Sequence, residues 1–104
     1  MSQPTLDKFQ QCLPVFSVLA DDNRQKILCL LDRERELNVN QLTEQLHLSR
    51  PAVSHHLKLM LDKQLIKVNQ IGKERYYSLN LQPTLASLKE LVALLEQDEA
   101  ARQA

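Results

Sequence analysis

Two adjacent histidines, His55 and His56, are the residues of this chain that most directly suggest chemistry. They lie in the stretch SRPAVSHHLKLM, residues 49–60. Histidines at this density suit a metal site, an acid–base site or a surface that binds DNA. Neighbouring residues on a helix point about 100° apart, whereas two metal ligands on one helix need a spacing of three or four residues. The pair is therefore a poor chelate by itself.

Catalysis is disfavoured as well, because an acid–base histidine needs a positioned partner and a pocket. The chain has no nucleophile elbow, no glycine-rich phosphate loop and no HExxH motif. We therefore expect no enzyme, and a surface for DNA is the favoured interpretation of the two histidines.

The helix that carries the histidines, expected over about residues 49–63, has one buried and one outward face. Val53, Leu57 and Met60 define the buried stripe. His55 then points nearly opposite to this stripe, whereas His56 lies on its flank and is expected to be half-buried, holding the turn by a hydrogen bond. The outward face offers donors for phosphates and base edges. The residues expected to contact DNA there are Ser49, Arg50, Pro51, Ser54, His55 and Lys58.

Positive charge is concentrated around this helix. The 104 residues contain 13 Lys and Arg and 13 Asp and Glu, so the net charge is zero. Residues 47–77 hold six of these cations and two of the acids, so this segment carries +4 and the remainder −4. A basic block in a neutral chain favours a face for a polyanion, although a solvated patch without function is compatible with it too.

Local signals divide the chain before this helix into shorter helices. Apolar residues recur at helical spacing from Leu6 to Phe16, and Pro14 is expected either to kink this helix or to start a new one near Leu13. The residues suited to cap the three following helices are Asp21 or Asp22, then Asn38 in a capping box with Gln41, and finally Ser49.

Beyond Gln64 the apolar period changes to about two, which predicts strands. LIKVNQ and RYYSLN flank the tip IGKE, so a hairpin is expected over about residues 65–79. Lys73 and Arg75 at this tip are placed for contact with the DNA backbone or minor groove. One of Tyr76 and Tyr77 should pack on the core, because neighbouring strand residues face opposite sides.

A long helix follows, expected over about residues 83–100. Leu81, Leu85, Leu88, Val92 and Leu95 repeat at steps of 4, 3, 4 and 3, which is a narrow apolar seam. Such a seam can pack within one subunit, but a partner helix is the favoured interpretation. The order of elements predicts a mainly α fold with a β-hairpin wing, a winged helix-turn-helix in one domain of residues 1–104.

The ordered motifs resemble those of the arsenic-repressor-like (ArsR/SmtB) winged-helix transcriptional regulators. The similarity runs over residues 19–80, through LADDNRQKILCLL, LTEQLHLSRPAVSHHLKLM and LIKVNQIGKERYYSLN. It implies a homodimeric repressor of inverted-repeat DNA operators that an inducer releases. By position, Arg50, Ser54 and His55 would read the groove, and Lys73 with Arg75 would form the wing. Terminal helices would form the dimer interface, through Leu6, Phe9, Leu13, Leu85, Leu88, Val92 and Leu95.

Two metal sites common in this family lack their ligands here. One uses cysteines where this chain has Asn38 and Asn40, which are poor ligands for soft or borderline metals. The other needs Asp and His pairs on the terminal helices, and residues 81–104 contain no histidine. We therefore expect no metal and no cofactor, although a metal site of another composition remains open.

The two cysteines, Cys12 and Cys29, are the remaining candidates for a signal. Cys29 matches one of two cysteines in a thiol- and persulfide-sensing subgroup of the family, but the second, in the last helix, is missing, and Cys12 would have to replace it. Lys26 and Arg33 share the face of Cys29 and favour its reactive thiolate, whereas Cys12 lies at the edge of an apolar stripe and looks more inert. Both cysteines are also compatible with small buried apolar residues, and an unknown organic inducer is the other alternative.

The location and the class of function complete these expectations. There is no apolar stretch of membrane-spanning length and no signal-peptide pattern, so a cytoplasmic chain with reduced cysteines and no membrane partner is expected. A winged-helix module that binds another protein instead of DNA is the alternative function.

Overall fold

The computed structural model describes residues 1–104, which form five helices and a three-stranded sheet. This architecture confirms the expected fold class, mainly α with a β-hairpin wing. The helices are α1 (Gln3–Leu19), α2 (Asp22–Glu34), α3 (Val39–Gln45), α4 (Arg50–Asp62) and α5 (Gln82–Gln103); the strands are β1 (Glu36–Leu37), β2 (Ile66–Ile71) and β3 (Glu74–Leu79).

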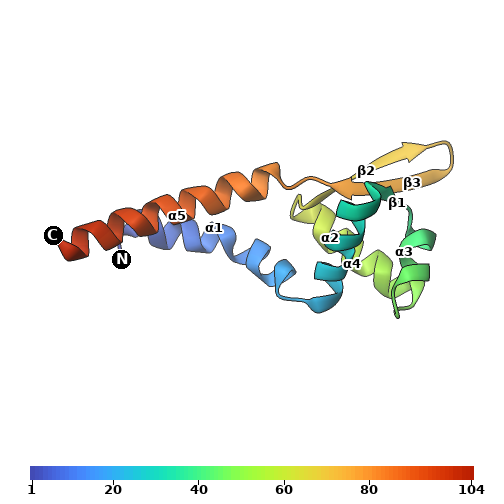
Figure 1. Ribbon diagram of the computed structural model, residues 1–104, viewed down its shortest axis with the longest axis horizontal. Helices are drawn as coiled ribbons and strands as arrows, with labels where there is room; N and C mark the ends of the chain where they lie inside the picture. The colour runs from blue at the N-terminus through green and yellow to red at the C-terminus, as the bar shows by residue number, and fades with distance from the viewer.

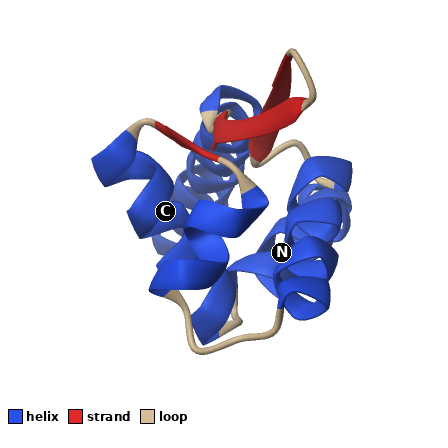
Figure 2. Cartoon of the chain, turned by 90° about the vertical axis from the view of Figure 1, so that its right-hand side faces the viewer, coloured by secondary structure: helices blue, strands red, loops and turns tan.

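The molecule has two regions, which we call the body and the arm. The body consists of α2, α3, α4 and the sheet, and the arm consists of α1 and α5 lying side by side (Figure 1). Both chain termini lie at the far end of the arm, and the overall dimensions are 57 × 25 × 21 Å. Viewed toward the end of the body, the strands lie along one side of the helices (Figure 2). None of the helices combines the length and the apolar character that a membrane span requires.

Each of the first four helices begins at a side chain that accepts a hydrogen bond from the helix backbone. This satisfies one of the amide groups that a helix start leaves without an internal partner. The expected capping box at α3 is confirmed, and of the two candidates for α2 the structure uses Asp21. The four capping residues are Ser2, Asp21, Asn38 and Ser49.

The sheet has β3 at its centre, with β1 and β2 paired antiparallel on either side. The hairpin closes between Ile71 and Glu74, where Gly72 has a φ of +63°, a left-handed conformation that glycine adopts without strain. Sequence patterns do not predict β1, whose Leu37 pairs with Tyr77 of β3. Strand β1 ties the start of α3 to the wing.

The core of the body is apolar and continuous. One of the two tyrosines, Tyr77, lies in this core while Tyr76 is half-exposed, as the strand pattern predicts. The buried stripe expected on α4 is confirmed, because Val53, Leu57 and Met60 are all in the cluster. Its twelve residues are Val18, Ile27, Leu31, Leu37, Leu42, Leu46, Val53, Leu57, Met60, Leu65, Ile66 and Tyr77.

Helix α1 continues through Pro14 as one helix, so no second helix begins near Leu13. Proline removes one backbone hydrogen bond from a helix interior. Packing of α1 on α5 supplies contacts that a free helix would lack.

Candidate nucleic-acid interface

Helices α3 and α4 form a helix-turn-helix, with residues 46–49 as the turn. Leu42 and Leu46 on one side and Val53 and Leu57 on the other are buried, so apolar contacts fix the second helix against the first. The outward face of α4 is left to solvent. Every residue that the sequence assigns to DNA contact on this helix is exposed: Ser49, Arg50, Pro51, Ser54, His55 and Lys58.

A concave surface of about 540 Å³ lies between the outward face of α4 and the wing. Arg50, Ser54 and Lys58 line it from α4, and Lys73 and Arg75 line it from the hairpin. Five of the eight residues expected to contact DNA thus meet in one hollow. The other three, Ser49, Pro51 and His55, are exposed but do not line it.

Four further polar residues line this hollow that the sequence patterns did not assign to the DNA-binding surface. Asn38 and Asn40 belong to the start of α3, and Asp62 and Glu74 add carboxylates beside the cations. The Asn38 amide lies 3.5 Å from a carboxylate oxygen of Glu74, the limit of a hydrogen bond. The capping box predicts that Asn38 begins α3. It does not predict that α3 lies beside the wing, because this proximity depends on the pairing of β1 with β3.

His56 is half-buried as expected, but the expected hydrogen bond to the turn is wrong. Its Nδ1 is buried without any hydrogen-bond partner, and its ring centre lies 6.2 Å from that of His55. His55 is exposed, so the two rings have separate environments, as the geometry of a helix requires.

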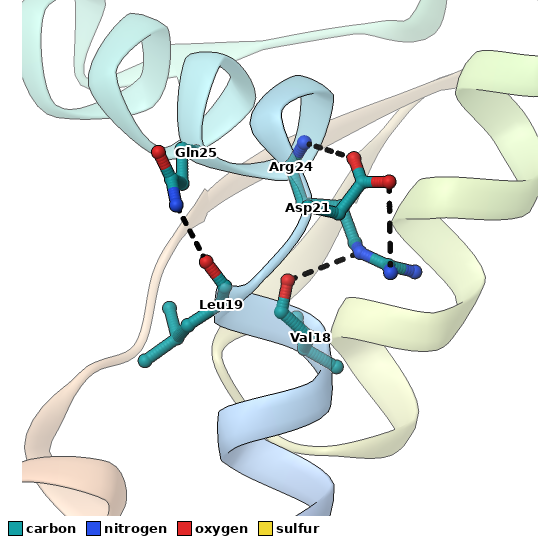
Figure 3. Close-up of polar contacts among 5 residues, drawn as sticks. All are labelled: Val18, Leu19, Asp21, Arg24 and Gln25. Carbon is teal, nitrogen blue, oxygen red and sulfur yellow. Dashed lines mark hydrogen bonds and ion pairs between the residues drawn. The ribbon is translucent and has the colours of Figure 1, made fainter.

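The junction between the arm and the body consists of the end of α1 and the start of α2 (Figure 3). Asp21 accepts a hydrogen bond from the amide of Arg24 at 3.0 Å, and Arg24 Nε donates to the carbonyl of Val18 at 3.1 Å. Gln25 donates to the carbonyl of Leu19 at 2.7 Å. These bonds join the last turn of α1 to the first turn of α2 (Figure 3). The LADDNR segment of the sequence is therefore the joint between the two regions.

The pKa of Asp21 is lowered from its ordinary value of 3.8. The main cause is the hydrogen bond from the Arg24 amide; burial opposes it as the second-largest effect, and the positive charge of Arg24 adds to the lowering. A hydrogen bond to a carboxylate favours its ionised form. The helix cap is consequently charged at neutral pH, where it also interacts favourably with the start of α2.

The arm differs from the body because polar contacts join its helices. Thr5 Oγ1 donates to a carboxylate oxygen of Asp98 at 2.7 Å, and Lys8 Nζ contacts Glu90 Oε2 at 2.5 Å. Thr5 and Lys8 are buried, as is Cys12. The start of α1 therefore lies beside the end of α5, and the two helices are antiparallel.

Large apolar side chains point out of the arm. Leu85 is 41% exposed and Val92 is 53% exposed, although both belong to the apolar seam expected on this helix. Thr84 and Leu91 are the buried residues of α5 instead. Of the other residues expected in a dimer interface, Leu6 and Leu13 are exposed, whereas Phe9, Leu88 and Leu95 are half-buried.

The two cysteines lie in different environments, and both are free thiols. Cys12 was expected at the edge of an apolar stripe, but it is only 1% exposed and is therefore more deeply buried than expected. Cys29 is exposed on α2, beside a shallow hollow that Lys26 and Gln45 also line. Arg33, expected beside Cys29, donates to Gln45. No group of three or more His, Cys, Asp or Glu side chains within the chain is arranged to hold a metal ion.

Comparison with known proteins identifies relatives along this same region. The family model described as bacterial regulatory protein, arsR family, matches residues 21–68, from the start of α2 into β2. A transcriptional repressor, the SmtB homolog of Synechocystis, is 39% identical over 75 residues, which cover 72% of this chain and 56% of that protein. The chain thus spans little more than half of this relative's length.

Two further relatives are covered over more of their length. The transcriptional repressor SdpR of Bacillus subtilis is 35% identical over 66 residues, which cover 64% of this chain and 72% of that protein. The CadC homolog of Staphylococcus aureus, a cadmium resistance transcriptional regulatory protein, is 38% identical over 89 residues, which cover 84% of this chain and 70% of that protein.

Solved structures extend the similarity to the arm. An ArsR-like transcriptional regulator from Rhodococcus sp. RHA1 superposes with a TM-score of 0.74 at 26% identity, covering 99% of this chain and 94% of that one. NolR from Sinorhizobium fredii gives a TM-score of 0.72 at 27% identity, with 92% of each chain covered. The Synechocystis, Bacillus, Staphylococcus and Rhodococcus proteins are described as transcriptional repressors or regulators, not as enzymes. From its sequence relatives and its winged helix-turn-helix fold, the chain belongs to the arsR family of bacterial regulatory proteins.

Proposed function

We propose that this protein is a transcriptional repressor that binds an inverted-repeat DNA operator as a homodimer. The observation that carries the proposal is the hollow between α4 and the wing, where Arg50, Lys58, Lys73 and Arg75 converge. A helix with exposed donors fits the major groove, and a basic hairpin beside it reaches the neighbouring backbone or minor groove.

Charge and geometry divide the roles within this surface. Arg50 and Ser54, near the start of α4, and His55 on its exposed face are the residues that would reach base edges. Lys73 and Arg75, on the wing, would contact phosphates and set the position of α4 on the duplex. Asp62 and Glu74 line the same hollow and would repel phosphates, which limits how the duplex can be placed.

The homodimer is supported by the exposed apolar residues of the arm, because a second copy would bury them. An arm shared by two copies would carry two bodies related by a two-fold axis, which matches the symmetry of an inverted repeat. The recognition helices would then lie about one DNA turn, roughly 34 Å, apart.

A band-shift titration tests the proposal. A duplex taken from upstream of the protein's own gene should be shifted at moderate salt. A shuffled duplex of the same composition should need a much higher protein concentration for the same shift. Arg50→Ala should relax this preference, and Lys89→Ala, which removes an exposed cation of α5, should leave it unchanged. If wild type and Arg50→Ala bind all fragments equally weakly, a winged-helix module for protein partners becomes the better account.

We further propose that, if a thiol signal controls this repressor, it acts at Cys29. Its exposure is the observation in favour, and the burial of Cys12 argues against a direct reaction there. Operator affinity should be compared in reduced, oxidised and persulfide-treated protein, with Cys29→Ser as the control. A change in the wild type that Cys29→Ser lacks supports the thiol signal, and equal affinity in all states rejects it.

A further inference from the structure

The contact between α1 and α5 is unusual for two helices that pack along their length, because three of the six buried residues of these helices are polar. The buried residues of α5 are Thr84 and Leu91, and those of α1 include Thr5 and Lys8. Thr5 is 0% exposed and Lys8 is 9% exposed. Buried polar groups cost free energy unless they find partners, so their positions restrict which arrangements of the helices are stable.

Each of the two buried polar groups of α1 has a specific partner on α5. Asp98 accepts from the Thr5 hydroxyl at 2.7 Å and from the Ser2 amide at 3.2 Å. Glu90 lies 2.5 Å from Lys8 Nζ, which also donates to Gln11 at 3.3 Å. We call the pairs Thr5–Asp98 and Lys8–Glu90 the polar clasp.

The outward faces of both helices carry apolar residues with the same period. Leu6 and Leu13 are seven residues apart on α1, and Leu85 and Val92 are seven residues apart on α5; all four are exposed. Seven residues correspond to two turns of helix, about 10 Å along the axis. The two pairs therefore form rows of equal spacing, whose alignment depends on how α1 sits along α5.

We infer that the polar clasp fixes the register of α1 on α5 and thereby aligns the two apolar rows into one surface for a second copy of this chain. The inference rests on the homodimer of the proposed function. It assigns a positioning role to residues that would not themselves contact the partner.

The physical argument is one of specificity. Apolar contacts tolerate sliding, and a slip of one turn would displace the rows of α1 and α5 by about 5.4 Å relative to each other. Such a slip would separate Thr5 from Asp98 and Lys8 from Glu90, leaving buried polar groups without partners. A single polar contact within an apolar interface is known to select register in paired helices.

Charge reversal with rescue tests the inference. Lys8→Glu places two carboxylates together, Glu90→Lys places two ammonium groups together, and the double variant restores an ion pair of opposite polarity. Gln11 can serve either polarity, because its amide both donates and accepts. Lys89→Glu is the matched control, since Lys89 is exposed and makes none of the hydrogen bonds or ion pairs of the structure.

The readouts separate association from folding. Sedimentation equilibrium gives the dimer dissociation constant of each variant. Near-ultraviolet circular dichroism of tyrosine reports on the body alone, because the chain has no tryptophan and both tyrosines lie in β3. A variant that keeps this signal has a folded body, so its loss of association arises in the arm.

We expect each single reversal to raise the dissociation constant on the order of tenfold, and the double variant to return close to the wild type. The control should stay within about twofold of the wild type. Unchanged association in the single variants, or no recovery in the double variant, overturns the polar clasp while leaving the proposed homodimer intact. A wild type that does not self-associate overturns both.

Discussion

The body and the arm of this molecule are stabilised in opposite ways. The body has one buried cluster of twelve apolar residues, to which the arm contributes only Val18 at the end of α1. In the arm, Thr5 and Lys8 are buried, while Leu85 and Val92 face solvent. The body thus has the apolar interior of an independent domain, whereas the arm buries polar residues and leaves several large apolar residues exposed.

This contrast divides the functions of the chain. A closed core holds α4 in place, which would suit the proposed recognition of DNA by a few side chains of this helix. The arm would complete its burial only with a second copy, so it would set the distance between two recognition helices. The two regions meet at Arg24, whose side chain donates to the carbonyl of Val18 in α1 and whose amide donates to Asp21, the cap of α2.

The largest expected effect is in the body. Leu57→Ala removes a residue that is 1% exposed at the centre of the core, and it should lower the free energy of unfolding by about 2–5 kcal/mol. Urea denaturation followed by tyrosine circular dichroism measures this change. Leu85→Ala, the same substitution in the arm, should have a much smaller effect in dilute protein. Equal losses would contradict the contrast between the regions.

A charge in the apolar face of the arm should act on association. Val92→Glu should raise the dimer dissociation constant at least about tenfold, because a second copy would have to bury the carboxylate. The urea midpoint of the body should stay close to that of the wild type. Ala100→Glu, an exposed position on the same helix, serves as the control in sedimentation equilibrium. Unaltered association in Val92→Glu would place the dimer interface elsewhere.

Substitution of the proposed DNA contacts should leave both regions folded and associated. Arg50→Ala should cost about 1–3 kcal/mol of operator binding and should relax the preference for the operator over mismatched duplexes. His55→Ala should act in the same direction. Fluorescence anisotropy with single-base operator variants gives both quantities. A loss that is uniform over all sequences would assign these side chains to phosphates instead of bases.

A small pH effect is expected in the arm. The hydrogen bonds from Thr5 and Ser2 lower the pKa of Asp98 from its ordinary value of 3.8. A lowered pKa in the folded state stabilises the fold above the unfolded value, and this contribution is lost as the pH falls through the folded pKa. The difference in free energy of unfolding between wild type and Asp98→Asn should therefore be largest near neutral pH and shrink below about pH 3.8. If the difference in free energy of unfolding between wild type and Asp98→Asn grew on acidification, the lowered pKa of Asp98 would be contradicted.

Local features of the sequence predicted most of the fold. The caps Asp21, Asn38 and Ser49 and the hairpin tip at Gly72 depend on neighbouring residues, so they can be read without knowledge of the rest. Strand β1 has only two residues, and its pairing with β3 joins segments about forty positions apart in the sequence. For this reason, the contribution of Asn38 and Asn40 to the hollow was not predicted either.

The arm shows what the period of a single helix leaves open. The leucine repeat of α5 predicts an apolar seam, with a partner helix as the favoured neighbour, and the structure leaves Leu85 and Val92 of this seam exposed while it buries Thr84 and Leu91. The inward face depends on polar residues of α1, and the period of one helix contains no information about its partner. The wrong prediction of a hydrogen bond for His56 has a similar cause. The half-burial of this residue follows from its position on the helix, whereas the absence of a partner for Nδ1 depends on the surrounding elements.

The salt dependence of operator binding tests the proposed function most directly. The logarithm of the association constant should fall linearly with the logarithm of salt concentration, because cations at α4 and the wing would displace counterions from phosphates. Lys73→Ala should weaken binding to all sequences alike and reduce the slope by about one, while Lys89→Ala should leave the slope unchanged. An interaction with duplex DNA that does not depend on salt, or the same slope in Lys73→Ala as in the wild type, would contradict DNA binding through this surface.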